Sequence, residues 1–425
     1  MIDHSTSFID NPAIIGILRR ACNYVDKRLM DHGVRVSYIV SRLLRGWPGI
    51  DAAKLRDICL LAALHDIGAY KTEEISRMLQ FESGDVWDHS IYGYLFVKHF
   101  SPLSELAPAV LFHHTPWYVL RENETLGEEC KQLAQLIHIA DRLDICINRE
   151  NRSYSEFIQT LTADRGEIFE AALTDRLLRE DFSGFTAEEV EGDPVFCQMQ
   201  SEVTFTGEEL MGYLQMIIYS IDFRSRHTVT HTITTASISY ELARRLHLDK
   251  HDIDEIVWGA LLHDLGKIGI PTEILEYPGK LSPQAMAIMR THVEITDRIF
   301  DHSIPHRIRL IALRHHEKLD GSGYPLGLTA ADLSIGERIV AVADIVSALA
   351  GTRSYKAAYS KDRVITVLQD MRGRGLIDSG AVGCMTAQYD DIMDHTKRRS
   401  QPIANVYEAI QTEYGRLRRQ YSDKN

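Results

Sequence analysis

The sequence lacks long apolar runs and paired cysteines. Its six cysteines are scattered over 425 residues and form no C-x-x-C pair, so reduced thiols are expected instead of a disulfide framework. No apolar run is long enough to cross a bilayer, and the first residues do not resemble a signal peptide. We therefore expect a protein of the cytoplasm without a membrane-spanning segment.

The sequence also lacks an excess of positive charge. It has 47 lysines and arginines against 60 aspartates and glutamates, which gives a net charge of −13 with histidine neutral. Proteins that bind duplex nucleic acid normally carry a basic face, so this class is disfavoured. A small phosphorylated ligand held by a few cations and metal ions stays compatible with the acidic balance.

Stretches that alternate between apolar and polar residues are scarce, and apolar residues recur mainly at helical spacing. An apolar stripe covers residues 253–262 and ends before Gly266. Ser334 and Glu337 form a capping-box pattern ahead of an apolar run over 339–349. These patterns predict an all-α fold, and the length of the chain predicts two domains.

The two halves of the chain repeat one pattern of histidines and aspartates. The first half contains His32, His65, Asp66, His89, His113, His114 and Asp141. The second half contains His231, His263, Asp264, His292, His315, His316 and Asp344. From the opening histidine to the His-Asp pair the gap is 33 residues in the first half and 32 in the second, and from the His-His pair to the closing aspartate it is 27 and 28. We therefore predict two tandem, related helical domains, residues 1–162 and 206–425, joined by an acidic connector over 163–205.

The repeated residues have the side chains of a transition-metal centre. Imidazole and carboxylate groups suit iron, manganese or zinc, and an aspartate such as Asp264 can bridge two ions where a histidine cannot. Five histidines and two aspartates at matched positions exceed what structural roles require of one domain. The seven residues of the second half are therefore predicted to bind metal, and the seven of the first half are a second candidate set.

Further residues beside the second set suit a phosphorylated substrate. Lys267, in the turn after the His-Asp pair, could steady a phosphoryl oxygen or orient Asp264, although a plain surface lysine is the alternative. The run Gly-Ser-Gly-Tyr-Pro follows the His-His pair closely, and Gly323 within it allows close approach of the backbone. Tyr324 offers a ring for stacking on a base and a hydroxyl for a phosphate.

Three further positions each allow two interpretations. His227 lies one turn before His231 and could face the same way on a helix as a further ligand, or it could be a solvated or capping histidine. Arg353 and Lys356 follow Asp344 at a spacing that lets both reach one anionic ligand, with arginine offering a bidentate fork to phosphate. The alternative for this pair is a solvated helix start.

With its motifs His-Asp-x-Gly-Lys-x-x-x-Pro and His-His-Glu-x-x-Asp-Gly-x-Gly-Tyr-Pro, the second half resembles an HD-GYP domain, a subgroup of the HD superfamily of metal-dependent phosphohydrolases. The resemblance covers residues 206–400. It implies an all-helical domain with two or three metal ions, commonly iron or manganese, that hydrolyses cyclic di-GMP to a linear dinucleotide and sometimes onward to mononucleotides. It also implies metal binding by the seven residues of the second half, catalysis through Asp264 and Lys267, and substrate contacts by Gly323, Tyr324, Arg353 and Lys356.

Departures from the family pattern leave parts of this assignment open. Family members with a third metal often have a glutamate where this chain has His227, so two ions and three ions are both compatible. The family's Asp-Arg-Pro-Tyr stretch is Thr-Arg-Ser-Tyr here, which keeps Arg353 but alters its frame. A cyclic GMP-AMP-specific phosphodiesterase and a cyclic dinucleotide sensor without activity remain the alternatives to a cyclic di-GMP phosphodiesterase.

The first half resembles a plain HD domain. It has Ala69 where the second half has Lys267, and Thr115 follows its His-His pair without a Gly-Tyr-Pro run. A regulatory or dimerising role, in which the chain forms a homodimer or meets a signalling partner, is favoured over a second active site. In the second half we expect a water activated between two ions, bridged by Asp264, to attack phosphorus in line while Lys267 absorbs negative charge.

Overall fold

The computed structural model describes residues 16–17, 20–21, 24, 31–69, 87–183, 190, 193, 196, 206–224, 230–351 and 358–421. In these ranges the regular structure is helical, and only two isolated β-bridges occur. The predicted all-α fold is confirmed for the described residues. Three of the predicted site residues, His227, Arg353 and Lys356, lie outside the described ranges.

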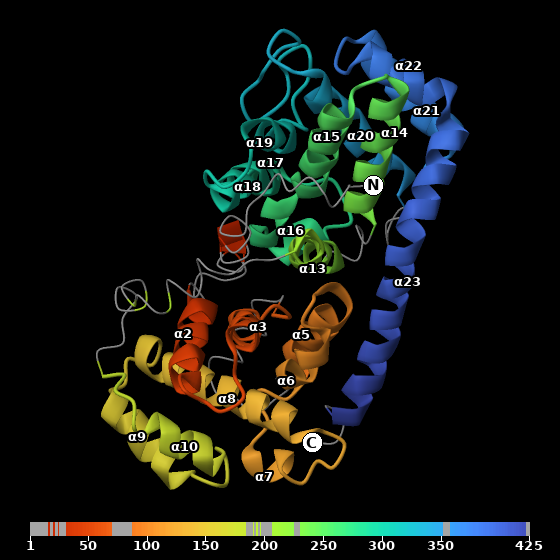
Figure 1. The fold of residues 1–425 in the computed structure, drawn as a ribbon. Helices are drawn as coiled ribbons and strands as arrows, with labels where there is room; N and C mark the ends of the chain where they lie inside the picture. Colours follow the sequence, from red (N-terminus) through yellow and green to blue (C-terminus); the bar gives the residue numbers. More distant parts are fainter. Residues whose placement is uncertain are drawn as a thin grey trace. The chain divides into compact units, whose positions relative to one another are not determined.

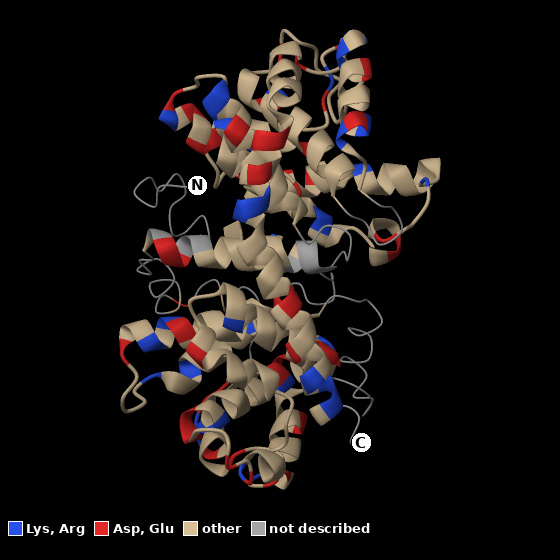
Figure 2. Cartoon of the chain, turned by 90° about the vertical axis from the view of Figure 1, so that its right-hand side faces the viewer, with Lys and Arg blue, Asp and Glu red and all other residues tan. Residues whose placement is uncertain are grey.

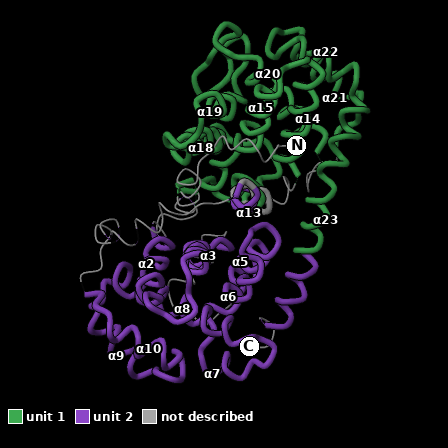
Figure 3. Tube along the Cα trace, in the orientation of Figure 1, with its two compact units in different colours: residues 1–21, 217–410 green, residues 22–216, 411–425 purple. Residues whose placement is uncertain are grey.

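The chain forms two compact units (Figure 1, Figure 3). The first unit along the chain, which is purple and keyed as unit 2 in Figure 3, consists of residues 22–216 with 411–425. The second unit, which is green and keyed as unit 1, consists of residues 1–21 with 217–410. Residues 206–216 and 411–425, expected in the second domain, therefore group with the first unit, and the described residues among 1–21, expected in the first domain, group with the second. For this reason the helices α13 (Gly207–Arg224) and α23 (Tyr389–Tyr421) each contribute residues to both units.

The first unit is built on one long helix, α8 (Glu128–Asn148), along which Ile137, Ala140 and Leu143 are fully buried. Its other helices are α2 (His32–Leu44), α3 (Ala52–Ala63), α5 (Trp87–Phe100), η2 (Ser104–Leu106), α6 (Ala107–Leu111), α7 (Trp117–Leu120), α9 (Tyr154–Ala163) and α10 (Ala171–Leu177). Helices α2, α6 and α9 pack against α8. This packing buries the inner faces of the helices that carry the first set of histidines and aspartates.

The end of α23 belongs to the first unit because it packs on α5. The ammonium group of Lys98 lies 2.8 Å from a carboxylate oxygen of Glu413. The ring of Tyr92 stacks on that of Tyr414 with 4.3 Å between centroids. An ion pair and an aromatic stack thus attach the last turns of this helix to the helix that carries His89.

The second unit is arranged around α14 (His231–Arg245), which packs on α15 (Lys250–Leu262) and α20 (Ile335–Ala350). The side chains of Ile238, Val257 and Val342, one from each of these helices, are fully buried. The capping box of Ser334 and Glu337 is formed at the start of α20, as the sequence predicts. The other helices are η3 (Leu265–Gly269), α16 (Thr272–Leu275), α17 (Pro283–Arg290), α18 (His292–Phe300), α19 (His306–Leu313), α21 (Lys361–Gly373) and α22 (Ser379–Ala387).

Charged residues of both signs are interspersed on the helices of each unit (Figure 2). On α18, for example, Arg298 and Glu294 form an i,i+4 pair with 3.9 Å between nitrogen and oxygen. No helix in the described ranges combines the length and the apolar composition that crossing a bilayer requires.

Candidate metal centres

Each candidate centre is built on the turn that follows a His-Asp pair. In the second unit this pair joins α15 to the 3-10 turn η3. A Cβ on Gly266 would lie 1.9 Å from the carbonyl oxygen of His292, and a Cβ on Gly68 would lie 2.1 Å from that of His89. Only glycine lets the turn approach the helix that carries the next histidine so closely. The matched glycines therefore bring the His-Asp pair and the third histidine together in both units.

Backbone carbonyl groups orient the histidine rings of the second unit. The Nδ1 atoms of His263, His292 and His315 lie 2.7, 2.7 and 2.6 Å from the carbonyl oxygens three residues earlier. Because Nδ1–H donates to the carbonyl oxygen, the tautomer is set and Nε2 is left to face the centre. Within the described ranges, the Nε2 atoms of all three histidines and Oδ1 of Asp264 are buried without a hydrogen-bond partner.

Asp264 lies between two groups of histidines. Its Oδ2 is 3.4 Å from Nε2 of His231 and 3.0 Å from Nε2 of His263. Its Oδ1 is 3.6 Å from Nε2 of His292 and 3.9 Å from Nε2 of His315. Two ions placed at the two nitrogen groups would each meet one oxygen of the same carboxylate, which is the arrangement of a two-metal site.

Asp344 completes the second centre from α20. Its Oδ1 lies 3.1 Å from Nε2 of His231, and its Oδ2 lies 3.8 Å from Nδ1 of His316. All seven residues that the sequence singles out in this half therefore lie together. Their ligand atoms form two groups with members within 4.8 Å of one another, namely His231, His263 and Asp264, and His292, His315 and His316.

Burial and neighbouring charges set different protonation states in the second centre. Burial would lower the pKa of His231, but Asp264 and Asp344 outweigh it and raise this pKa to about 9. Burial lowers the pKa of His316 to about 3 in spite of the nearby charge of Asp344. Burial would raise the pKa of Asp344, yet His231 and His316 hold it well below its usual range. Ionised carboxylates, the neutral imidazole of His316 and buried donor atoms without partners fit a divalent transition metal, whereas His231 would have to lose a proton to bind one.

Three of the predicted catalytic and substrate residues border this centre. Lys267 forms an ion pair with Asp264. The ring of Tyr324 lies 4.6 Å from that of His316, centroid to centroid, with 31° between the planes. A Cβ on Gly323 would lie 2.4 Å from the Cα of Glu317, so this glycine lets the Gly-Tyr-Pro loop fold back onto the His-His motif.

Three residues that the sequence analysis does not single out hold the site in position. The buried carboxylate of Glu317 accepts the backbone N–H groups of Leu326 and Leu328 at 2.7 and 3.0 Å. The hydroxyl of Thr296 accepts the N–H of the glycine in the His-Asp turn at 2.8 Å, and that of Ser347 lies 3.0 Å from Nδ1 of the opening histidine. The i+3 spacing of Ser347 from the closing aspartate is the signal that could have identified it.

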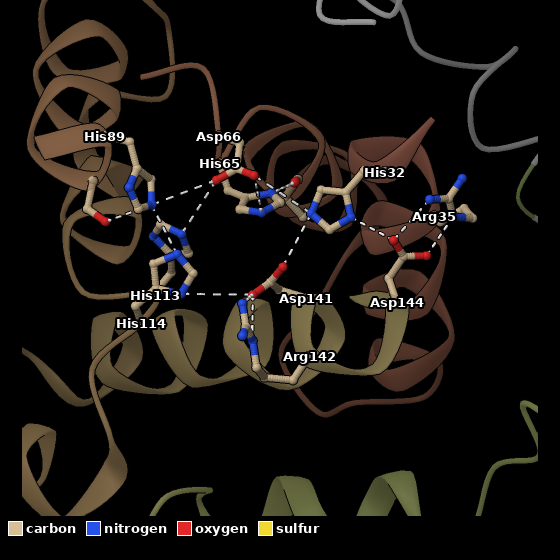
Figure 4. Close-up of polar contacts among 12 residues, drawn as sticks. His32, Arg35, His65, Asp66, His89, His113, His114, Asp141, Arg142 and Asp144 are labelled. Atoms are coloured by element: carbon tan, nitrogen blue, oxygen red, sulfur yellow. Dashed lines mark hydrogen bonds and ion pairs between the residues drawn. The ribbon is translucent and has the colours of Figure 1, made fainter. Parts of the chain in front are cut away.

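The first unit repeats the arrangement around Asp66 (Figure 4). Oδ2 of Asp66 lies 3.8 Å from Nε2 of His32 and 3.6 Å from Nε2 of His65. Its Oδ1 lies 3.9 Å from Nε2 of His89 and 3.8 Å from Nε2 of His113. In the described part of the chain, the Nε2 atoms of His32, His65 and His113 are buried and have no hydrogen-bond partner. The first set of residues therefore also fits two ions on one carboxylate.

Asp141 closes the first centre from α8. Its Oδ1 lies 3.3 Å from Nε2 of His32, and its Oδ2 lies 3.9 Å from Nδ1 of His114. The guanidinium group of Arg142 donates to the same Oδ2 at 2.6 Å (Figure 4). The second half has Ile345 at this position, so a cation on the closing aspartate distinguishes the first centre.

Asp144 and Arg35 hold His32 from the side away from the other ligands (Figure 4). Nδ1 of His32 lies 2.6 Å from Oδ2 of Asp144, and Arg35 donates to both oxygens of this carboxylate at 2.5 and 3.0 Å. Burial would lower the pKa of His32, but Asp141 and Asp144 raise it to about 10. A carboxylate behind a ligating histidine orients the ring and makes it more basic, and the second unit has Ser347 in the corresponding place.

Both halves of the chain match sequence families described as HD domain, over residues 29–146 and 215–380. The chain is 27% identical over 383 residues to the 3'3'-cGAMP-specific phosphodiesterase 1 of Vibrio cholerae, which covers 85% of this chain and 88% of that protein. It is 38% identical over 164 residues to a cyclic di-GMP phosphodiesterase response regulator of Xanthomonas campestris, covering 38% of this chain and 43% of the relative. It is 36% identical over 179 residues to a cyclic di-GMP phosphodiesterase of Thermotoga maritima, covering 41% of this chain and 49% of the relative.

A solved structure with a similar fold matches most of the chain. It is a crystal structure of a cyclic GMP-AMP-specific phosphodiesterase of Vibrio cholerae, with a TM-score of 0.51 and 19% sequence identity, and the match covers 90% of this chain and 98% of that chain. At this level of identity the likeness concerns the fold.

Proposed function

This chain belongs to the HD-domain family, with an HD domain in each half and homology to the HD-GYP phosphodiesterases, and on that premise we propose that its second domain hydrolyses a cyclic dinucleotide. The observation that carries the proposal is the carboxylate of Asp264, which offers one oxygen to each of two histidine groups. Lys267 and the Gly-Tyr-Pro loop stand beside this carboxylate. Relatives named as cyclic dinucleotide phosphodiesterases support the substrate class.

Cyclic di-GMP is the substrate we expect, and cyclic GMP-AMP is the second candidate. Similarities over less than half of this chain are to proteins named for cyclic di-GMP and to proteins named for cyclic GMP-AMP. The similarity that covers most of both chains is to a protein named for cyclic GMP-AMP. Arg353 and Lys356 remain proposed contacts to the phosphates of either compound.

Iron or manganese is the metal we propose for the second centre. Its donors are imidazole nitrogens and carboxylate oxygens without a thiolate, which suits these ions. The seven residues from His231 to Asp344 would hold two ions. A third ion would need a further ligand, for which His227 is the candidate.

In the proposed reaction, residues of the second domain hold the metal ions and orient the substrate. When bound, the two ions would lower the pKa of a water molecule and take up negative charge from phosphate oxygens. Asp264 would hold both ions, one at each carboxylate oxygen; Lys267 offers its ammonium group to a non-bridging oxygen, and Tyr324 orients the dinucleotide. Attack of the deprotonated water on phosphorus forms a new P–O bond and breaks the bond to the 3′ oxygen, which takes up a proton from solvent. The product is a linear dinucleotide with a 5′ phosphate.

The test is anaerobic purification with metal analysis, followed by incubation with cyclic di-GMP and with cyclic GMP-AMP and chromatography of the products. We expect bound iron or manganese and a linear dinucleotide from one of the two substrates. Asp264→Ala is the matched variant, which should lose turnover together with metal. Bound metal with both cyclic dinucleotides left intact would overturn the proposal in favour of a sensor.

We also propose that the first domain binds metal but has a regulatory or dimerising role. The bridging geometry of Asp66 supports the metal. Ala69 supplies no cation where the second domain has Lys267, and Arg142 occupies an oxygen of Asp141. In the full chain, Asp66→Ala should lose metal and keep hydrolysis of the cyclic dinucleotide. Unchanged metal content would argue against this centre, and loss of hydrolysis with second-centre metal retained would assign it to catalysis.

A cytoplasmic location and a homodimer or signalling partner complete the proposal. The described cysteines Cys59, Cys130, Cys146 and Cys384 are free, and the cytoplasm would keep them reduced. Light scattering on the purified full chain and on Asp66→Ala measures whether the chain is a dimer and whether the first centre affects dimerisation.

A further inference from the structure

Two cations border the second centre without an acidic partner in the described ranges. Lys318 follows the metal-ligand candidate His316 by two residues, and Arg290 precedes His292 by two residues. Within the described residues neither side chain forms a hydrogen bond or an ion pair. Lys267, by contrast, is paired with the bridging aspartate. The two unpaired cations are therefore available to an anionic ligand.

Lys318 is half-buried next to the centre. The buried carboxylate of the preceding residue, Glu317, is directed into the loop, where it accepts two backbone N–H groups. The backbone nitrogen of Lys318 packs against Gly323, whose Cβ would lie 2.4 Å from it. A half-buried ammonium without a counter-ion is costly, and an anion at the centre would remove that cost.

Arg290 lies further out, at the exposed end of α17. Its guanidinium carbon is 4.7 Å from the ring centroid of Tyr324, and that ring is 4.6 Å from the ring of His316. One aromatic ring thus separates the guanidinium group from a predicted metal ligand. The planar fork of arginine matches the oxygens of a phosphate group.

The first domain shows that these cations are not needed to hold the ligand residues. At the positions that correspond to Lys267, Arg290 and Lys318, the first domain has Ala69, Trp87 and Pro116. The ring of Trp87 is used instead in a stack on Tyr421, with 4.9 Å between centroids. Both domains arrange their histidines and aspartates alike, but only the second has the three cations and the Gly-Tyr-Pro loop. The presence of the cations therefore correlates with the loop and not with the candidate metal ligands.

We propose that Lys318 and Arg290 bind the two phosphates of the cyclic dinucleotide. Lys318 binds the phosphate that is cleaved at the metal centre, and Arg290 binds the second phosphate beyond Tyr324. A cyclic dinucleotide carries two phosphodiester groups on one ring, so only one of them can lie at the centre while the other meets the outer part of the site. The inference rests on the proposed function of the second domain.

The experiment compares two substrates in the full, metal-loaded chain. The first substrate is the cyclic dinucleotide that the chain cleaves, cyclic di-GMP or cyclic GMP-AMP, which has two phosphodiester groups. The second is bis(p-nitrophenyl) phosphate, which has one. Loss of one charge-assisted hydrogen bond predicts a fall in kcat/KM of about 10- to 100-fold. Lys318→Gln should show this fall on both substrates, whereas Arg290→Gln should show it on the cyclic dinucleotide alone and mainly through KM. Arg290→Lys should recover part of the loss, and Arg298→Gln, an exposed arginine on α18, is the control.

The outcomes separate this inference from the proposed function. If the wild-type chain cleaves neither cyclic dinucleotide, the proposed function itself fails. If it cleaves one of them and either Lys318→Gln or Arg290→Gln is unaffected on that compound, the function stands and the inference is overturned. An equal fall on both substrates for Arg290→Gln, or a loss of bound metal in either variant, would also overturn it, because those results indicate a structural role.

Discussion

Metal binding to the second centre should release a proton at neutral pH. His231 must be neutral to act as a ligand, yet in the metal-free chain Asp264 and Asp344 outweigh burial and raise its pKa to about 9. At pH 7 only about one molecule in a hundred then has this imidazole neutral. The apparent metal affinity of the second centre should therefore rise about tenfold per pH unit from pH 7 to about 9 and level off above it.

The metal affinity of the first centre should also rise with pH, and over a wider pH range. Asp141 and Asp144 raise the pKa of His32 to about 10 against the effect of burial, so its metal affinity should continue to rise for about one further pH unit. His113 and His316 do not contribute to the rise of metal affinity above pH 7, because burial lowers the pKa of each to about 3.

Isothermal titration calorimetry of chelator-treated protein with manganese, in two buffers of different ionisation enthalpy, counts the protons released. The Asp66→Ala variant isolates the second centre, and Asp264→Ala isolates the first. We expect about one proton per centre at pH 7.5 from the opening histidine. No proton release, together with a flat affinity between pH 7 and 9, would refute the argument that the carboxylates keep these histidines charged in the metal-free chain.

Four further predictions concern single residues. Asp264→Asn should remove turnover and second-centre metal while the first centre keeps its metal, and metal analysis with an activity assay checks this; full activity would contradict the bridging role. Gly266→Ala should destabilise the fold by about 1–3 kcal/mol or more, because its Cβ would meet a backbone oxygen at 1.9 Å, and an unchanged denaturation midpoint would show that the turn can shift. Asp144→Asn should weaken first-centre metal binding about 10- to 100-fold with hydrolysis intact, as calorimetry would measure. Tyr324→Phe should raise KM severalfold through one lost hydrogen bond at constant metal content, and loss of metal would instead mark the loop as structural.

The two clusters of histidines and aspartates could be predicted from the sequence because their pattern occurs twice. A His-Asp pair, a third histidine, a His-His pair and a closing aspartate recur in the same order, and an adjacent His-Asp pair at a helix end has few structural uses. The glycine after each pair was visible as well, but its role was not. Only the packed structure shows that Gly266 and Gly68 lie against the backbone of the next histidine-bearing helix.

The partners of the charged residues around the centres could not be predicted from the sequence. The sequence patterns do not single out Arg290 or Lys318, because whether a cation has a partner depends on residues distant in the chain. The same holds for Arg35, which is 109 positions from the carboxylate of Asp144 that it contacts. The end of α23 likewise groups with the first unit through side-chain contacts, among them those to α5.

The sequence by itself determined the all-α fold, the tandem of two HD domains and the residues of the two histidine and aspartate clusters, because helical periodicity, capping and motif spacing are local properties of the chain. The tertiary structure alone decided which oxygen of Asp264 faces which histidine and how far each pKa is shifted. His231 and Asp344 are 113 residues apart and come within 3.1 Å only because α14 and α20 pack together. Distances and burial of this kind arise from long-range packing, which no local pattern encodes.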